Sequence, residues 1–247
     1  MAVNIQAISV ATAGTTVRAS VAHSVAGGNR FLLVHVGYTA GGTVVSAAAD
    51  GTVMTKQVCA VSTPSKAAIF TLANVSAGLI PIVFEFQATA SSVAIGIISF
   101  TSVEQTTPIG TISTEASAGA VDASANVSAA PGDLAFGLIH VGDGLVSALQ
   151  GTLEYQGLIA TAAQTSNLLG LSQLGDMGLR HFRVAGIGAG LTYVMYGTQI
   201  RAFRSSAGAA GPYGPTGGRG PTGGQAGVTD PMTSVGDENV GGESRVD

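Results

Sequence analysis

Two histidines occupy equivalent positions in an internal repeat and are the first candidates for chemistry. His35 lies in the segment FLLVHVG (residues 31–37) and His140 in FGLIHVG (residues 136–142). The alternation of side chains along a strand places each histidine on the same face as the phenylalanine that opens its segment. Two rings brought together could bind a metal ion, but no third ligand lies in a similar context. We therefore interpret both as core-strand histidines that hydrogen-bond to the backbone.

Other signatures of catalysis are absent from the sequence. There is no Gly-x-Ser-x-Gly motif and no Cys–His signature, and the glycines at 186, 188 and 190 precede an expected strand rather than a phosphate-binding helix. Cys59 is the only cysteine, which excludes an intrachain disulfide and a multi-cysteine metal site. Glu85 is the one acid in an apolar strand and is expected to point outward. We predict no catalytic residue, no cofactor and no metal, and therefore no enzyme.

A strict glycine period marks the C-terminal part of the chain. A polyproline-II chain needs glycine at every third residue when it packs against two others, because only hydrogen fits at the shared axis. A flexible linker is the alternative, although a linker has no reason to keep the period. Tyr213 lies inside this collagen-like segment and is expected to pack against a neighbour. The glycines of the six triplets, which we predict to be assembly residues, are Gly208, Gly211, Gly214, Gly217, Gly220 and Gly223.

Charge is scarce and unevenly placed. Only 10% of residues are charged, and the net charge of −4 predicts no general attraction to nucleic acid or anionic lipid. Residues 177–229 carry arginines and no acid, whereas residues 230–247 carry five acids and a single arginine. We therefore expect the acidic tail of one subunit to contact the basic strands of another, with a solvated tail as the alternative. The expected contact residues are Arg201, Arg204, Asp237 and Glu238.

Composition suggests a protein covered by its neighbours. The mean hydropathy of the 247 residues is +0.43, yet no apolar run reaches the length of a membrane span. A surface of Ala, Gly, Ser, Thr and Val suits a subunit of an assembly. The N-terminus lacks the basic and apolar regions of a signal peptide, so we expect the protein to fold in the cytoplasm of the cell that makes it, without export.

Short β-branched runs separated by Gly, Asn, Ser and Pro predict an all-β, antiparallel sandwich. Residues 165–174 are the one weak helix candidate. The segments VRAS at 17–20 and VDAS at 121–124 continue the repeat at an offset of 104 residues. Such a duplication fits two immunoglobulin-sized sandwiches or one jelly roll with similar halves, and the missing linker favours the jelly roll. The expected domains are a sandwich at 1–206 (repeats 15–103 and 111–204), the collagen-like segment at 207–225 and an acidic tail at 226–247.

Three stretches carry a resemblance to a known domain. The sequences NRFLLVHVG (29–37), ISFTSVEQTTPIGT (98–111) and PGDLAFG (131–137) resemble a β-sandwich domain of phage virion and tail proteins and of bacterial secreted proteins. The similarity covers roughly residues 1–204, and the chain departs from the family pattern in having no tryptophan. The resemblance implies a structural or binding role and carries over no catalytic residues.

The sequence as a whole predicts a structural virion protein. We expect a phage capsid decoration, fibre or tail component that forms a homotrimer and contacts other virion subunits. The alternative is a glycan- or surface-binding module of a tail fibre or cell-surface protein, in which exposed Tyr38 or Tyr155 would stack on sugars. A sugar site would survive removal of residues 208–247, whereas assembly would not.

Overall fold

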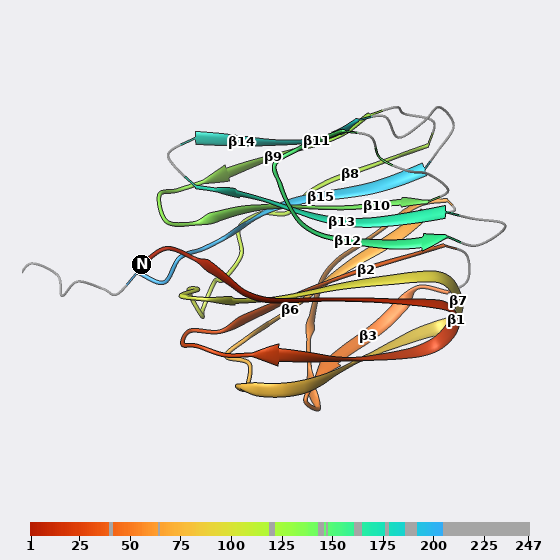
Figure 1. The fold of residues 1–247 in the computed structure, drawn as a ribbon, viewed down its shortest axis with the longest axis horizontal. Helices are drawn as coiled ribbons and strands as arrows, with labels where there is room; N and C mark the ends of the chain where they lie inside the picture. The colour runs from red at the N-terminus through yellow and green to blue at the C-terminus, as the bar shows by residue number, and fades with distance from the viewer. Residues whose placement is uncertain are drawn as a thin grey trace, which may run out of the picture. The chain divides into compact units, whose positions relative to one another are not determined.

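A computed structural model describes residues 1–39, 42–63, 65–118, 122–142, 146, 148–160, 165–175, 178–185 and 192–204. The chain divides into a compact unit, Met1–Ser205, and a second unit, Ser206–Asp247, that lies outside the described residues. Regular structure in the described part is entirely β, and every pairing between its strands is antiparallel, as predicted (Figure 1). Within those residues, no helix is long and apolar enough to cross a membrane.

The first half of the compact unit forms a seven-stranded sheet that folds over on itself. Its two longest strands, β1 and β7, pair along nearly their whole length. The first part of β7 also pairs with β3, and its second part with β2, so that β1 and β7 run through both layers of a nearly closed sheet. The strands are β1 (Asn4–Val25), β2 (Phe31–Thr39), β3 (Val44–Ala49), β4 (Thr52–Val53), β5 (Thr55–Ser62), β6 (Ser65–Ala73) and β7 (Gly78–Thr101).

The second half forms two separate sheets. A five-stranded sheet has the order β12-β13-β10-β15-β8, and a three-stranded sheet has the order β11-β14-β9. The strands are β8 (Ser113–Ala118), β9 (Asp122–Ala129), β10 (Leu134–Gly142), β11 (Ala148–Gln150), β12 (Thr152–Ala160), β13 (Thr165–Leu174), β14 (Gly178–Ala185) and β15 (Thr192–Ile200).

The two halves repeat one pattern of strand pairing. Strands β8 and β9 take the places of the two parts of β1, strands β15 and β14 those of the two parts of β7, and β10 that of β2. Each described strand pairs inside its own half, and only two isolated bridges, Val103 with Ala202 and Ile109 with Ile200, connect the halves. This pairing differs from the expected single jelly roll shared by both halves. Each half has enough strand segments to complete two layers alone.

Three apolar cores separate four layers of strands. One core lies inside the first half and another inside the second. The third lies between the halves, where the ring of Phe100 lies 5.7 Å from that of Phe136 of the second half and 6.1 Å from that of Phe31, measured between ring centroids. The side chains of β2 alternate accordingly. Phe31 and Leu33 face the other half, whereas Leu32 and Val34 face their own core.

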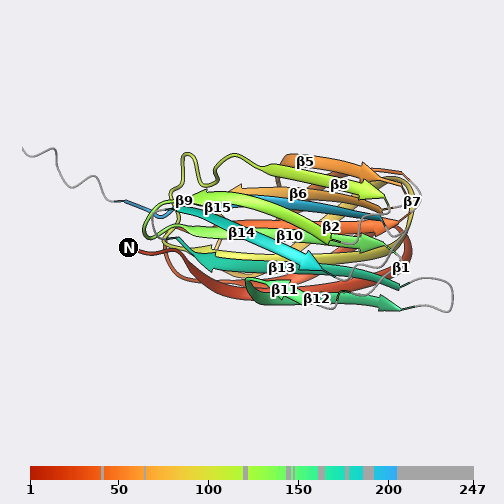
Figure 2. The ribbon, with the colours of Figure 1, turned by 90° about the horizontal axis from the view of Figure 1, so that it is seen from above.

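The halves pack about an approximate two-fold axis. Strand β2 contacts its equivalent β10, while β1 contacts β12 and β5 contacts β8. Because β8 is equivalent to β1, and β12 to β5, the last two contacts are the same contact formed twice. Figure 2 shows β1 and β12 along one side of the molecule and β5 and β8 along the other. A single chain thus packs like a two-fold symmetric dimer.

Three local features of the strands can be compared with the sequence. Residues 165–174 form strand β13 and not a helix, because Leu168 faces the core between the halves while Leu169 and Leu171 face the core of the second half. That alternation has the period of a strand. The Asp50-Gly51 turn is present, with φ of 47° and 75°, values typical of the tight hairpin turn that joins β3 to β4. Strand β1 begins at Asn4, well before the strand expected to open the repeat near residue 16.

Candidate functional site

The equivalent histidines meet in the core between the halves. His35 on β2 and His140 on β10 are both fully buried. The Nδ1 of His35 lies 3.2 Å from the hydroxyl of Tyr155 on β12. The ring of Tyr196 on β15 meets the His35 ring edge-on, with centroids 6.1 Å apart. Both histidines lie in core strands as expected, but the partner of His35 is a side chain of the other half rather than the backbone.

Glycines make room for these rings. A Cβ on Gly37 would lie 2.6 Å from Cγ of His140 and 2.7 Å from Cδ1 of Leu168. The Tyr155 ring occupies the space beside Gly96 and Gly170, where a Cβ would come within 2.6 Å of the Tyr155 hydroxyl and Cδ1, respectively. Bare backbone at these strand positions therefore lets the two sheets approach closely.

Burial keeps this cluster uncharged. Burial lowers the pKa of His140 to about 3. Burial, followed by the charge of His140, lowers the pKa of His35 well below its ordinary value. Burial also raises the pKa of Tyr155. Groups that stay neutral and out of reach of solvent suit packing better than acid–base exchange with a substrate. Among the described residues, no group of three or more His, Cys, Asp or Glu side chains could hold a metal ion.

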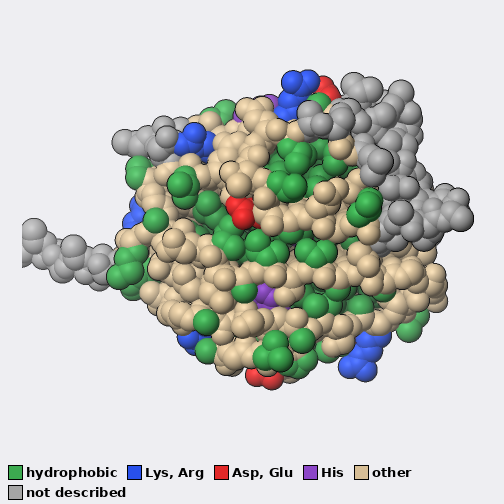
Figure 3. Space-filling model, in the orientation of Figure 1, with side chains coloured by type: hydrophobic (Ala, Val, Ile, Leu, Met, Phe, Trp, Pro, Cys, Tyr) green, Lys and Arg blue, Asp and Glu red, His purple; other side chains and the backbone are tan. Residues whose placement is uncertain are grey.

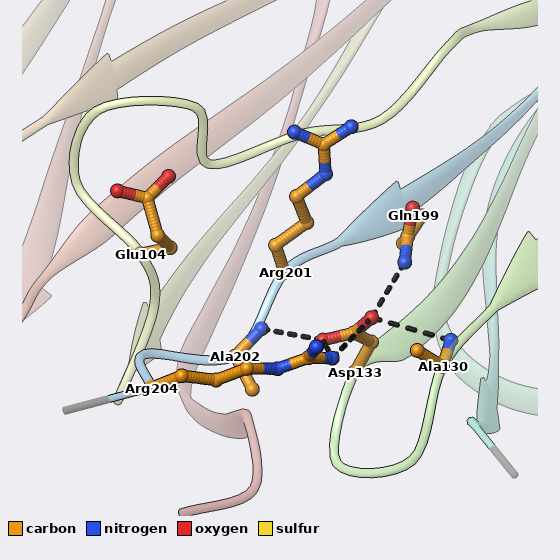
Figure 4. A pocket seen from close by; sticks show the side chains of 7 residues that line it. All are labelled: Glu104, Ala130, Asp133, Gln199, Arg201, Ala202 and Arg204. Atoms are coloured by element: carbon orange, nitrogen blue, oxygen red, sulfur yellow. Dashed lines mark hydrogen bonds and ion pairs between the residues drawn. The ribbon is translucent and has the colours of Figure 1, made fainter. Parts of the chain in front are cut away.

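A second polar cluster closes the body where its last strand ends (Figure 4). Asp133 follows the turn at residues 130–132, in which Gly132 adopts a φ of 87°. Its side chain is 1% exposed. The carboxylate accepts hydrogen bonds from the backbone N–H of Ala130 at 3.2 Å, from Nε2 of Gln199 at 2.5 Å and from the N–H of Ala202 at 2.7 Å. One buried carboxylate thus fastens residues after β15 to the turn before β10.

Arg204 adds a charge to this cluster from the outside. Its Nη2 lies 3.2 and 3.3 Å from the two carboxylate oxygens of Asp133, although the arginine side chain is 62% exposed. The neighbouring Arg201 donates from Nη1 to the carbonyl oxygen of Thr107 at 3.4 Å. Two residues predicted for assembly, Arg201 and Arg204, therefore lie together beside a hollow of about 320 Å³. The hollow is lined by Glu104, Ala130, Asp133, Gln199, Arg201, Ala202 and Arg204.

The charges around this hollow balance. Two arginines and two acids, Asp133 and Glu104, line it, and Figure 4 shows Arg204 reaching the carboxylate of Asp133. Burial opposes ionisation of Glu104, but donors of Thr106 and Thr107 outweigh it and hold the pKa of Glu104 below its ordinary value. The site therefore presents no excess positive charge to an acidic tail. The arrangement is that of a structural contact, in which several hydrogen-bond donors converge on a buried carboxylate.

The structure also places the other residues singled out in the sequence. Tyr38 is fully buried and Tyr155 is 5% exposed, so neither offers a surface on which a sugar could stack. Glu85 is exposed on β7, as expected, and Cys59 is half-buried against the core of the first half. The remaining predicted assembly residues lie outside the described residues: Gly208, Gly211, Gly214, Gly217, Gly220, Gly223, Tyr213, Asp237 and Glu238.

Sequence reasoning missed the role of Asp133 and the pairing of Tyr155 with His35. The Pro-Gly-Asp run at 131–133 signals a turn, but nothing in it points to Gln199 or Ala202. Comparison with known proteins adds no further residue. No protein-family model, no curated protein and no solved structure matches the chain.

Proposed function

We propose that this chain is a structural subunit of a bacteriophage particle, a capsid decoration, fibre or tail component, that assembles through its body and its C-terminal segment. The buried Asp133 cluster is the observation that carries the proposal. It fastens Ala202 and Arg204 to the body immediately before the glycine-rich segment begins. A segment that only trails in solvent needs no such anchor, whereas a segment that joins subunits transmits force to the body at this point.

Each half of the body is a jelly roll in this proposal. The order of pairing supports it. In each half the first strand segment pairs with the last, the second with the seventh and the third with the sixth, as in a long hairpin rolled into two sheets. Jelly rolls are common in viral capsid proteins and also in lectins, so the fold is compatible with a virion role without requiring it.

The collagen-like segment is proposed to join three chains. Six triplets form a short triple helix that is marginal by itself, so contacts between bodies must support it. Alanine at position 214 or 217 would place a methyl group at the crowded axis. Alternatively, each segment lies as a single strand along a neighbouring subunit. The protein would then keep its structural role but would not form a trimer through this segment.

The test is the solution mass of the full chain beside a chain that ends at Ser206, measured by light scattering at matched concentrations. A full-length particle of three chains, or of a multiple of three, that contains fewer chains after truncation supports the proposal, and the Gly214→Ala/Gly217→Ala variant should reproduce part of that loss. If the full and truncated proteins contain the same number of chains per particle, assembly through the tail is overturned.

A further inference from the structure

Two sheet edges lie open along the same side of the molecule. Strand β12 is the last strand of its five-stranded sheet, and the first part of β1, residues 4–16, pairs only with β7. The two edges are stacked, because β1 contacts β12 and a Cβ on Gly157 would lie 3.1 Å from Cγ1 of Val10. In the described part of the chain no strand lies beyond either edge.

These edges have few of the features that normally protect an edge strand: each has one register shift of the bulge type near an end, between Ile5 and Ala7 in β1 and between Leu153 and Tyr155 in β12. Proteins block exposed edges with charges, proline or covering segments. Residues 4–16 contain no charged residue and no proline, and β12 contains one charged residue, Glu154. Glu154 accepts a hydrogen bond from Ser172 of the neighbouring strand and is thereby engaged within its own sheet.

Apolar side chains accompany the open backbone. Val10 on β1 is 40% exposed, and Leu153 and Leu158 on β12 are 43% and 48% exposed. Figure 3 shows hydrophobic side chains gathered across this side of the molecule, with the Lys and Arg side chains toward its rim. The opposite side differs in its strand β5, which carries the exposed Lys56, whereas Glu115 of β8 accepts hydrogen bonds from Tyr193 and Ser124 within its own half, as Glu154 does from Ser172.

We propose that this side, the β1/β12 edge, docks a second copy of the same chain. A two-fold axis perpendicular to the sheets would pair β1 antiparallel with its copy and, at the same time, β12 antiparallel with its copy. Because the middles of the two strands are stacked at Val10 and Gly157, one axis can pass through both edges. Two sheets then continue across the interface, and their main-chain groups supply the hydrogen bonds.

Self-pairing fits these strands for an electrostatic reason. A two-fold axis places residues near the centre of an edge close to their own copies, so a charge there would meet a like charge. Residues 4–16 carry no charge to repel. The only charge of β12 lies three positions from Gly157. The inference rests on the proposed structural role, but it concerns the body alone and needs no contribution from the tail.

The test compares two double variants that differ in the side of the molecule they alter. Thr12→Lys/Leu158→Lys places charges on the β1/β12 edge, and Thr114→Lys/Val61→Lys places them on the opposite edge strands β8 and β5. The sites are matched, since Thr12 and Thr114 are both exposed and Leu158 and Val61 are 48% and 49% exposed. The full chain and the chain ending at Ser206 are examined by sedimentation over a concentration series.

We expect the body to dimerise. Thr12→Lys/Leu158→Lys should weaken that dimer by roughly a hundredfold through like-charge repulsion. Thr114→Lys/Val61→Lys should leave the dimer intact. In hydrogen exchange of the wild-type chain, peptides of β1 and β12 should gain protection with concentration, and those of β5 and β8 should not. A monomeric body without such protection would overturn the edge proposal even if the full chain is a trimer. Loss of the dimer in the second variant alone would also overturn it. If the body is a dimer and truncation does not change the number of chains per particle, the edge proposal stands and the proposed assembly role of the tail is overturned.

Discussion

The hydroxyl of Tyr155 lies 3.2 Å from Nδ1 of His35 and connects strands 120 residues apart in the sequence. The two residues belong to different halves of the body, and both are buried in the core between the halves. Other buried polar contacts cross the same core, among them the hydrogen bond that the Tyr196 hydroxyl donates to the Ala67 carbonyl oxygen at 2.6 Å. Together they fix how one half is placed on the other, because sliding the sheets would leave buried polar groups without partners.

Tyr155→Phe removes that bond and leaves the ring in place. We expect the free energy of unfolding to fall by about 1–3 kcal/mol, because Nδ1 of His35 would be buried without a partner. Its Nε2 already has no hydrogen-bond partner among the residues that the structure describes. Denaturant unfolding of Tyr155→Phe, His35→Leu and the double variant measures the coupling. Strictly additive losses would show that the bond contributes nothing to stability.

Acid should destabilise the body through its buried histidines. In the unfolded chain a histidine takes up a proton near pH 6.5, whereas the folded state holds the pKa of His140 at about 3 and that of His35 well below normal. Between these values the unfolded state binds more protons, so stability is retained above about pH 6.5 and falls as the pH decreases, by roughly 1.4 kcal/mol per pH unit for each histidine.

The measurement is the urea midpoint between pH 7.5 and 4.5, for the wild type and for His140→Gln. The variant has one fewer titrating group, so its stability should change less steeply with pH, whatever its stability at neutral pH. Equal slopes for the two proteins would contradict a neutral, buried His140.

Gly37 is expected to tolerate no side chain. Gly37→Ala would drive a methyl group into the His140 ring and Leu168, at an expected cost of about 1–3 kcal/mol from overpacking. Gly14→Ala is the matched control in β1, since a Cβ there meets nothing within 4 Å. The control should change the thermal midpoint little or raise it slightly. A similar loss in both proteins would mean that strand glycine itself, and not the close approach of the halves, is responsible.

The Asp133 cluster predicts an asymmetry between the partners of one ion pair. Asp133→Ala would leave the buried N–H of Ala202 and the partly buried amide of Gln199 unpaired and should cost about 3 kcal/mol or more. Arg204→Ala should cost at most about 1 kcal/mol, because that side chain is largely exposed and the carboxylate keeps its other donors. Calorimetry of both variants measures the two losses of stability. Equal losses would rule out a cluster that depends mainly on the carboxylate of Asp133.

The sequence alone determined the strand character of the body and its duplication. Short β-branched runs between turn residues dictate strands wherever one face must be buried, and the shared FLLVHVG and FGLIHVG segments indicated that β2 and β10 are equivalent. The same segments indicated that His35 and His140 would lie on core faces. These are local properties, which composition and spacing express directly.

Only the tertiary structure decided how the halves meet. The leucines of 165–174 suit a helix or a strand, and burial against two different cores selected the strand β13. The partners of His35 and Asp133 come from Tyr155, Gln199 and Ala202, which are distant in sequence. No local spacing encodes such contacts, because they arise when two repeated sheets pack face to face and the bare backbone of Gly37, Gly96 and Gly170 sets how closely they approach.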